Sequence, residues 1–259
     1  MVRVVAAAML VVAAVARAEP FSHAAWARVL ERFVDGEGRV DYAALARDRT
    51  DLDAYVGQLA ATSPDRQPEA FPTAHDALAY WIDAYNASVM ARVVQSYPIA
   101  SVADASLLGK VGFFRLTRPD LGGQPTSLTT LEHAIIRERF REPRVHFALN
   151  CASRGCPHLP REPFSGDRLD AQLDRETRRF LAEERNVHVD HDARTLSLSA
   201  IFDWYADDFT GGDEDGGTVL AWIWRHADDA RAADLARAAG YHVRFVPYDW
   251  RLNDQHPKE

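Results

Sequence analysis

The sequence predicts an α+β fold in which a helical N-terminal layer packs on a small antiparallel sheet. Three observations lead to this prediction. Apolar residues recur with helical spacing through the first half of the chain, and short segments with strand-like alternation occur in the second half. The 259 residues are 47% hydrophobic, which is ordinary for a globular protein and argues against disorder.

The beginning of the chain has the pattern of a secretory signal. Arg3 precedes an unbroken apolar run over residues 4–15, and the small-residue triplet Ala16, Arg17, Ala18 follows it. We expect cleavage after Ala18. The run is shorter than the roughly 20 residues that a membrane-spanning helix needs, so we expect a periplasmic or secreted protein whose mature chain has no transmembrane segment.

One globular domain is expected over residues 19–259 once the signal at residues 1–18 is removed. A proline-rich loop at 61–72 divides it into a helical N-terminal part at 19–70 and a core at 71–259. The net charge of −8 is spread over mixed acidic and arginine-rich segments, without a basic face that could neutralise phosphates. The sequence therefore predicts no nucleic-acid partner, and we expect no cofactor.

Two helices are predicted before that loop, because each has apolar residues three and four positions apart on one face. A third and longer helix is predicted over 73–96, where apolar residues cover most of the circumference. Such a helix is central and buried, so Asn86 needs a buried hydrogen-bond partner. The apolar faces of the first two helices are Trp26, Val29, Leu30 and Phe33, and Leu52, Tyr55, Val56 and Leu59.

Helices, strands and loops follow one another in the remainder of the chain. A glycine- and proline-rich connection at 104–125, with a short hairpin, is long enough to act as a flap. A helix is predicted from about Thr129 to Arg141, and a strand over 144–150 delivers Cys151 to a loop. The later predicted elements are an amphipathic helix around 169–181, a hairpin at 187–199, a short aromatic helix at 200–209, one or two further helices and a final strand at 241–250.

Cys151 is the first candidate for chemistry. A cysteine that follows a strand and has small neighbours resembles a nucleophile, with backbone amides close to a substrate carbonyl. Its thiolate would need an imidazole nearby, and His133, His146 and His158 are available. In a regular strand His146 and Cys151 would face opposite sides, which favours His133. A local disulfide between Cys151 and Cys156 is the competing interpretation in an oxidising compartment.

Glu132 is the candidate for a third member of the site. Apolar residues lie three and four positions away on its predicted helix, so its carboxylate leans toward the core and requires a partner. It could orient an imidazole. Neighbours on a helix diverge by about 100°, so Glu132 cannot simply hold His133, and His146 is the alternative. Thr129 and Glu132 also have the spacing of a capping box.

A zinc site is a further alternative. His146, Cys151, Cys156 and His158 offer four nitrogen and sulfur ligands within thirteen residues. The spacing is not that of a paired Cys-x-x-Cys knuckle, and the predicted strand would have to bend sharply to bring the four together.

Five segments together resemble the family known as domain of unknown function 547, found in exported bacterial proteins and in plants. They are YWIDAYNASVM (80–90), SLTTLEHAIIR (127–137), EPRVHFALNCASRGCPHL (142–159), SAIFDWYADDF (199–209) and YDWRLN (248–253). The resemblance implies a papain-like or transglutaminase-like cysteine-enzyme core with a Cys-Glu-His triad on Cys151, Glu132 and His133. The segment SLTTLEH lacks the acidic residue that commonly precedes the pair, and SRGCPH has a second cysteine where serine or proline is more usual.

The leading hypothesis is an exported cysteine hydrolase or acyl transferase, similar to a peptidase, that acts on a peptide or amide. Cys151 attacks, His133 is the general base, Glu132 orients it and His146 is the reserve base. The alternatives are a non-catalytic peptide-binding or envelope-interaction module with a Cys151–Cys156 disulfide and, third, the zinc-binding protein. The candidate cleft residues are Asn86, Trp81, Phe113 and Trp204.

Overall fold

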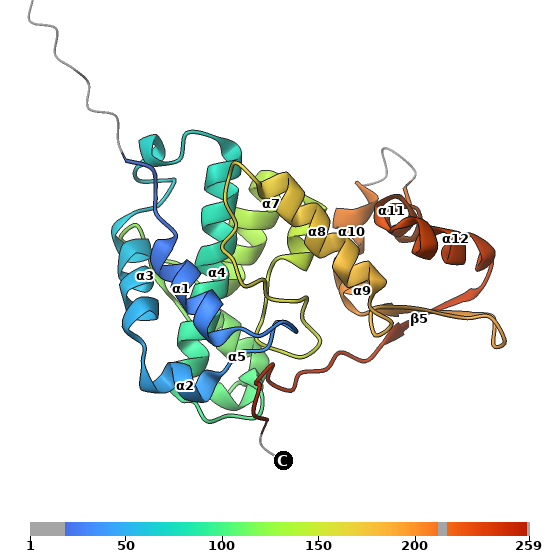
Figure 1. Cartoon of the computed structure of the whole chain (residues 1–259), viewed down its shortest axis with the longest axis horizontal. Helices are drawn as coiled ribbons and strands as arrows, with labels where there is room; N and C mark the ends of the chain where they lie inside the picture. Colours follow the sequence, from blue (N-terminus) through green and yellow to red (C-terminus); the bar gives the residue numbers. More distant parts are fainter. Residues whose placement is uncertain (1–18, 212–216, 258–259) are drawn as a thin grey trace, which may run out of the picture.

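The computed structural model describes residues 19–211 and 217–257, and the expected signal lies outside these residues. At its centre is helix α4 (Ala74–Ser96), which runs through the molecule in Figure 1. Thr73 caps it: the Thr73 hydroxyl accepts from the Asp76 N–H at 3.1 Å, and the Asp76 carboxylate accepts from the Thr73 N–H at 3.0 Å. Most of its side chains are buried. The prediction of a central buried helix over 73–96 is confirmed.

The N-terminal helices lie along one side of α4 (Figure 1). They are α1 (Ala24–Phe33), α2 (Tyr42–Arg47) and α3 (Thr50–Ala61), followed by the 3₁₀ turn η1 (Pro68–Ala70). The two predicted helical faces are buried as expected, apart from the half-buried Val56. Contrary to the prediction from the sequence, the helical layer does not pack mainly on a sheet. α1 packs on α3, and α3 packs chiefly on α4, because the all-round apolar surface of α4 offers the larger area to cover; α3 also contacts the hairpin strand β1 (Asp120–Leu121).

The connection after α4 is more helical than its glycines and prolines suggested. It contains the 3₁₀ turn η2 (Val102–Ala105) and helix α5 (Gly109–Leu116), and then a hairpin of β1 (Asp120–Leu121) and β2 (Gln124–Pro125). The predicted short hairpin is confirmed. Helix α5 exposes Val111 and Leu116 to solvent. That this segment moves as a flap stays a prediction.

The next helix extends from Leu128 to Phe140 and has three parts: α6 (Leu128–Thr130), the π-helical stretch η3 (Leu131–Arg137) and α7 (Glu138–Phe140). Its first residue is set by Ser127, whose hydroxyl accepts from the Thr130 N–H at 3.0 Å. The prediction that Thr129 and Glu132 form a capping box is therefore wrong. π-Helical turns are rare, and they occur frequently at functional sites.

The strand predicted over 144–150 is wrong. Residues Pro143–Phe147 form a 3₁₀ helix, η4, in which Pro143 occupies the first turn and the Glu142 carboxylate accepts from the Arg144 N–H. Every residue from 145 to 150 is buried, so the apolar alternation that suggested a strand does not separate an inner from an outer face. Because this segment is not a strand, its residues do not alternate between two sides, and His146 and Cys151 need not face opposite sides.

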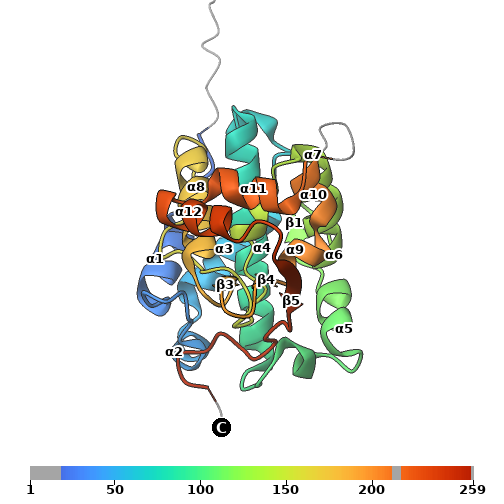
Figure 2. The ribbon, with the colours of Figure 1, turned by 90° about the vertical axis from the view of Figure 1, so that its right-hand side faces the viewer.

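The remaining elements build a smaller lobe. Helix α8 (Leu169–Ala182) leads to a three-stranded sheet of β3 (Val187–Asp190), β4 (Thr195–Ser199) and β5 (His242–Val246). Strands β3 and β4 form the predicted antiparallel hairpin, whereas β4 and β5 are parallel. The sheet is therefore mixed. A helical crossover between β4 and β5 allows β5 to run in the same direction as β4. That crossover consists of α9 (Ile201–Trp204), α10 (Ala206–Thr210), α11 (Val219–His226) and α12 (Asp229–Arg237). In Figure 2, α11 and α12 lie above the three strands.

Two hydrophobic clusters meet at η4. Val145 and Ala148 belong to the large cluster around α4, and Phe147 belongs to the cluster of the smaller lobe. After β5 the chain runs back across the molecule to the N-terminal helices (Figure 1), where the Gln255 N–H donates to the Val40 carbonyl at 3.1 Å. The α+β class is confirmed, and a papain-like core stays a prediction. None of the helices in the described part of the chain has the length and apolar character that a bilayer crossing requires.

Asn86 on α4 has the buried partners that the sequence required. Its amide NH₂ donates to the Ala148 carbonyl at 3.0 Å, and its oxygen accepts from the Asn150 N–H at 2.8 Å. Both groups are backbone atoms of the segment that leads into Cys151. The side chain thus ties that loop to the central helix.

Asn86→Ala should lower the free energy of unfolding by about 3 kcal/mol, because it leaves a buried carbonyl and a buried N–H without partners. Urea denaturation of both proteins measures the difference. Gln95→Ala, at an exposed position of the same helix, is the control and should change stability by less than about 0.5 kcal/mol. A loss below about 1 kcal/mol in Asn86→Ala would show that the loop is held by other contacts.

Candidate functional site

One cavity brings most of the candidate residues together. It has a volume of about 440 Å³ and lies where α4, α5, η3, η4, α9 and the segment after β5 meet. Cys151, His133, His146, Glu132 and Trp204 all line it. These residues come from three separate stretches of the sequence, so their convergence is a property of the fold.

Cys151 lies in a tight loop at one end of this cavity. It forms a disulfide with Cys156. The Asn150 side chain closes the loop from within: its oxygen accepts from the Ala152 N–H at 2.9 Å, and its NH₂ donates to the Pro157 carbonyl at 2.8 Å. The Tyr248 hydroxyl lies 3.1 Å from the Cys151 sulfur, and a disulfide sulfur has no proton, so the hydroxyl donates.

His146 is buried beside the same cavity and is paired with a carboxylate. Its Nε2 lies 2.6 Å from Oδ2 of Asp208, and its ring stacks on Tyr205 with 4.0 Å between the ring centroids. An ionised carboxylate only accepts, so Nε2 carries the proton and Nδ1 has the free lone pair. Burial lowers the pKa of His146, against the opposing effect of Asp208. At neutral pH His146 is therefore a neutral, oriented base.

Asp208 belongs to this candidate site through its contact with His146, and the sequence did not indicate it. Burial alone would raise its pKa, but hydrogen bonds from His146 and Arg137 hold the pKa of this carboxyl far below its ordinary value. The Arg137 guanidinium donates to both carboxylate oxygens, at 2.7 and 3.0 Å. Asp208 is within the aromatic segment 200–209, and nothing in that segment indicates a histidine partner 62 residues earlier in the chain.

His133 is less suited to act as a base. It is half exposed on η3, and the Arg137 guanidinium donates to its Nδ1. Since arginine is always a donor, this bond occupies the lone pair that a general base needs. The remaining nitrogen, Nε2, lies 4.0 Å from Oε1 of Glu132. The contacts therefore favour His146, the reserve base of the sequence analysis, over His133.

Glu132 is partnered by two tyrosines. The Tyr85 hydroxyl donates to Oε2 at 3.1 Å, and the Tyr205 hydroxyl donates to Oε1 at 2.6 Å. Burial, and then the charge of Glu132, raise the pKa of Tyr205 well above its ordinary value, which keeps this phenol protonated. Because Tyr205 stacks on His146, the carboxylate fixes the imidazole through an aromatic ring rather than by direct contact.

Aromatic side chains form part of the cavity wall. Trp204 is about half exposed and stacks on Trp250, and the Lys110 ammonium of α5 lies 4.0 Å from the centre of the Trp250 ring. The three other candidates for the cleft, Trp81, Asn86 and Phe113, do not line this cavity. Trp81 is buried in the large core against Tyr80. Asn86 is also buried, and its side chain bonds to the backbone of the segment that leads into Cys151. Phe113 is also buried, and its neighbour Phe114 lines the cavity instead.

The four proposed zinc ligands are not arranged around one point. The two cysteines are bonded to each other, His146 lines the cavity described above, and His158 lines a separate cavity next to Glu176. Within residues 19–211 and 217–257, no group of three or more histidine, cysteine, aspartate or glutamate side chains could hold a metal ion.

The cavity thus brings a buried Asp–His pair and a cysteine together. Residues 70–181 match the model of the family described as protein of unknown function, DUF547. The match includes α4, η3, η4 and the cysteine loop, and it confirms the resemblance found in the sequence. Searches of curated proteins and of solved structures found no match.

The His146–Asp208 pair predicts a particular pH titration. In an NMR titration His146 should have a pKa below the usual 6.5, because burial disfavours the imidazolium. In Asp208→Asn the pKa should fall further, since the carboxylate that favours the charged ring is gone. His146 is protonated at a lower pH in the folded protein than in the unfolded chain. Its contribution to the free energy of unfolding is therefore present above about pH 6.5 and is lost on acidification.

The exposed neighbour Asp207 supplies the control for this titration. Asp207→Asn should leave the His146 midpoint unchanged. A wild-type midpoint above 6.5, or equal effects of the two variants, would contradict the assignment.

Proposed function

We propose that the protein is an exported cysteine hydrolase or acyl transferase that acts on a peptide or amide after the Cys151–Cys156 disulfide is reduced. The observation that supports this proposal is the single cavity shared by Cys151 and the Asp208-oriented His146. Export is inferred from the first eighteen residues, which lie outside the described part of the chain.

The proposed reaction begins with proton transfer from the Cys151 thiol to Nδ1 of His146. The thiolate attacks the substrate carbonyl, and the imidazolium then gives its proton to the leaving amine. Water, or a second amine, attacks the resulting thioester with His146 again as the base. Asp208 stays ionised throughout and stabilises the imidazolium, as the acid of a catalytic triad does.

The carbonyl oxygen of the tetrahedral intermediate needs a hydrogen-bond donor. The backbone amides of Cys151 and Ser153 already donate to the Cys156 sulfur, at 2.9 and 3.3 Å. The Tyr248 hydroxyl is 3.1 Å from the Cys151 sulfur, and so lies close to the carbonyl group that this sulfur would attack. Its pKa is raised above its ordinary value by burial, so it remains a donor at neutral pH. We assign the oxyanion to Tyr248.

The disulfide supports a second candidate, a peptide-binding or envelope-interaction module that uses the same cavity without turnover. The two candidates differ in what reduction does. If the protein is an enzyme, reduction of the disulfide should produce amide hydrolysis. If it is a binding module, the reduced protein should bind its ligand without hydrolysing an amide.

The choice of base can be tested in the reduced protein without knowing the substrate. His146→Asn should slow iodoacetamide alkylation of Cys151 at pH 7 about tenfold, because less of the thiol is held as thiolate. It should also reduce hydrolysis of peptide p-nitroanilides by about 10²- to 10⁴-fold, the usual contribution of a general base. Peptide mass spectrometry and absorbance at the nitroaniline band measure the two rates.

His133→Asn is the matched control, because it changes the other imidazole of the same cavity. It should alter both rates by less than about threefold, since its lone pair already accepts from Arg137. A larger loss in His133→Asn than in His146→Asn would reverse the assignment of the base. Normal hydrolysis in Cys151→Ala would eliminate the enzyme proposal.

A further inference from the structure

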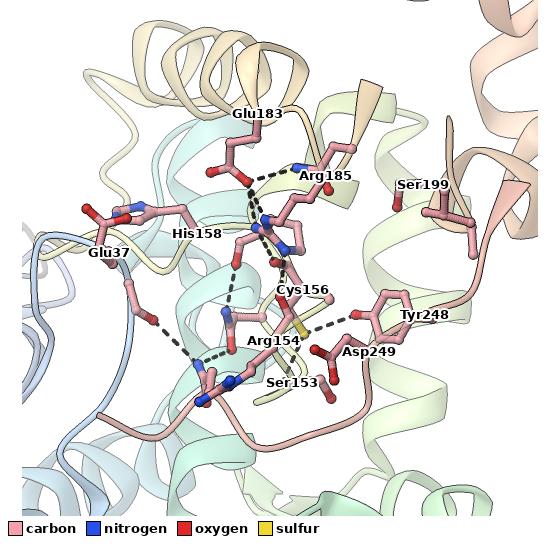
Figure 3. Close-up of a pocket in the computed structure, with 18 of the residues that line it drawn as sticks. Glu37, Ser153, Arg154, Cys156, His158, Glu183, Arg185, Ser199, Tyr248 and Asp249 are labelled. Carbon is pink, nitrogen blue, oxygen red and sulfur yellow. Dashed lines mark hydrogen bonds and ion pairs between the residues drawn. The ribbon is translucent and has the colours of Figure 1, made fainter. Parts of the chain in front are cut away.

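The two sulfurs of the disulfide have different surroundings. The Cys156 sulfur accepts from the Cys151 N–H at 2.9 Å, from the Ser153 N–H at 3.3 Å and from the Tyr248 hydroxyl at 3.2 Å. Figure 3 shows the Tyr248 hydroxyl directed at this sulfur. The same hydroxyl lies 3.1 Å from the Cys151 sulfur, so its single proton is shared between the two sulfurs and does not distinguish them. Within the described residues, the backbone N–H groups of Cys151 and Ser153 donate to the Cys156 sulfur alone. The donors are therefore concentrated on one side of the bond.

This asymmetry has a consequence for bond breaking. A disulfide sulfur is a weak acceptor, whereas a thiolate is a full negative charge that gains strongly from each N–H or O–H donor. Cys156 is 2% exposed, so its thiolate would depend on these protein donors for stabilisation. A sulfur that is better stabilised as thiolate is also the faster leaving group in thiol–disulfide exchange. Cys156 is therefore the sulfur that leaves.

The ionisable groups around Cys156 do not change which sulfur is better stabilised as thiolate. The separate cavity on its side is lined by Arg154 and Arg185, and also by Glu37, Glu183 and Asp249 (Figure 3). Arg185 is paired with Glu183 at 2.6 Å and donates to the Cys156 carbonyl. Charges of both signs lie on this wall, so the two backbone amides directed at the Cys156 sulfur decide which sulfur carries the charge.

We propose that the disulfide is a site of thiol exchange with a fixed direction, in which a low-molecular-weight thiol attacks Cys151. The incoming thiolate forms a bond to the Cys151 sulfur, and the Cys151–Cys156 bond breaks with its electron pair on Cys156. A second thiolate then attacks the small-thiol sulfur of the mixed disulfide and releases Cys151 as thiolate. Two thiols are oxidised to one small disulfide, and the protein disulfide is reduced to two thiols.

The cavity beside Cys151 indicates the class of the thiol. Its volume of about 440 Å³ is in the range of small-molecule pockets, and side chains of α5 line one part of its wall. A thiol of the size of a short peptide fits this space. The exchange does not depend on the proposed hydrolysis, because it requires no acyl substrate.

The sequence provides a direct way to test the direction of attack. Trypsin cleaves after Arg144, Arg154 and Arg161, so it places Cys151 in peptide 145–154 and Cys156 in peptide 155–161. The oxidised mature protein is treated briefly with reduced glutathione, quenched with N-ethylmaleimide and digested. Mass spectrometry should find glutathione on peptide 145–154 and maleimide on peptide 155–161, in at least about tenfold excess over the reverse pattern.

Two outcomes would overturn the proposal: glutathione on peptide 155–161, or an equal distribution between the peptides. Absence of hydrolytic activity would leave the glutathione distribution unchanged, so failure of the proposed hydrolysis can be distinguished from failure of the proposed exchange.

Tyr248→Phe should slow the exchange about tenfold, because it removes a donor to the leaving thiolate. Tyr241→Phe, whose hydroxyl contacts His191, is the control and should exchange at the wild-type rate. Equal rates in both variants would remove Tyr248 from the mechanism.

Discussion

The buried amide of Asn86 is the contact on which the arrangement of the site depends. It joins the central helix to the backbone on both sides of Leu149, and so fixes where the chain leaves η4 and enters the cysteine loop. The same loop is closed on the other side by Asn150, whose oxygen also accepts from Asn253 at 3.2 Å. Buried amides make these bonds in a fixed geometry, because an unmet backbone group would cost about 1–3 kcal/mol. Cys151 is placed by this network rather than by a strand.

A second network, of charges, prepares the imidazole. Arg137 holds Asp208 from one side and donates to His133 on the other, so one guanidinium fixes the carboxylate that pairs with His146 and occupies a lone pair of His133. Glu132 acts on His146 through Tyr205. Glu132 and His133 thus lie around an Asp–His pair whose imidazole comes from η4. The wider turn of the π-helical η3 carries Glu132, His133 and Arg137 together.

Local patterns predicted much of the fold, and non-local contacts account for what was missed. The long helix and the β3–β4 hairpin were predictable because their signals lie within a single stretch of sequence. The strand prediction for 144–150 was wrong because residues 145–150 are all buried, so their alternation of residue types does not mark a buried and an exposed face. Asp208 could not be found, because its partners His146 and Arg137 come from distant segments. The spacing of Cys151 and Cys156 allowed both a disulfide and a nucleophile, and the hydrogen bonds that distinguish the two sulfurs arise only in the fold.

The central claim is that reduced Cys151 and His146 form the reacting pair. A crystal structure of the reduced protein tests it most directly, through the distance between the Cys151 sulfur and Nδ1 of His146. We expect a separation of about 4 Å or less, which a thiol–imidazole hydrogen bond requires. A sulfur more than about 6 Å from both His146 and His133 would contradict the proposed catalysis.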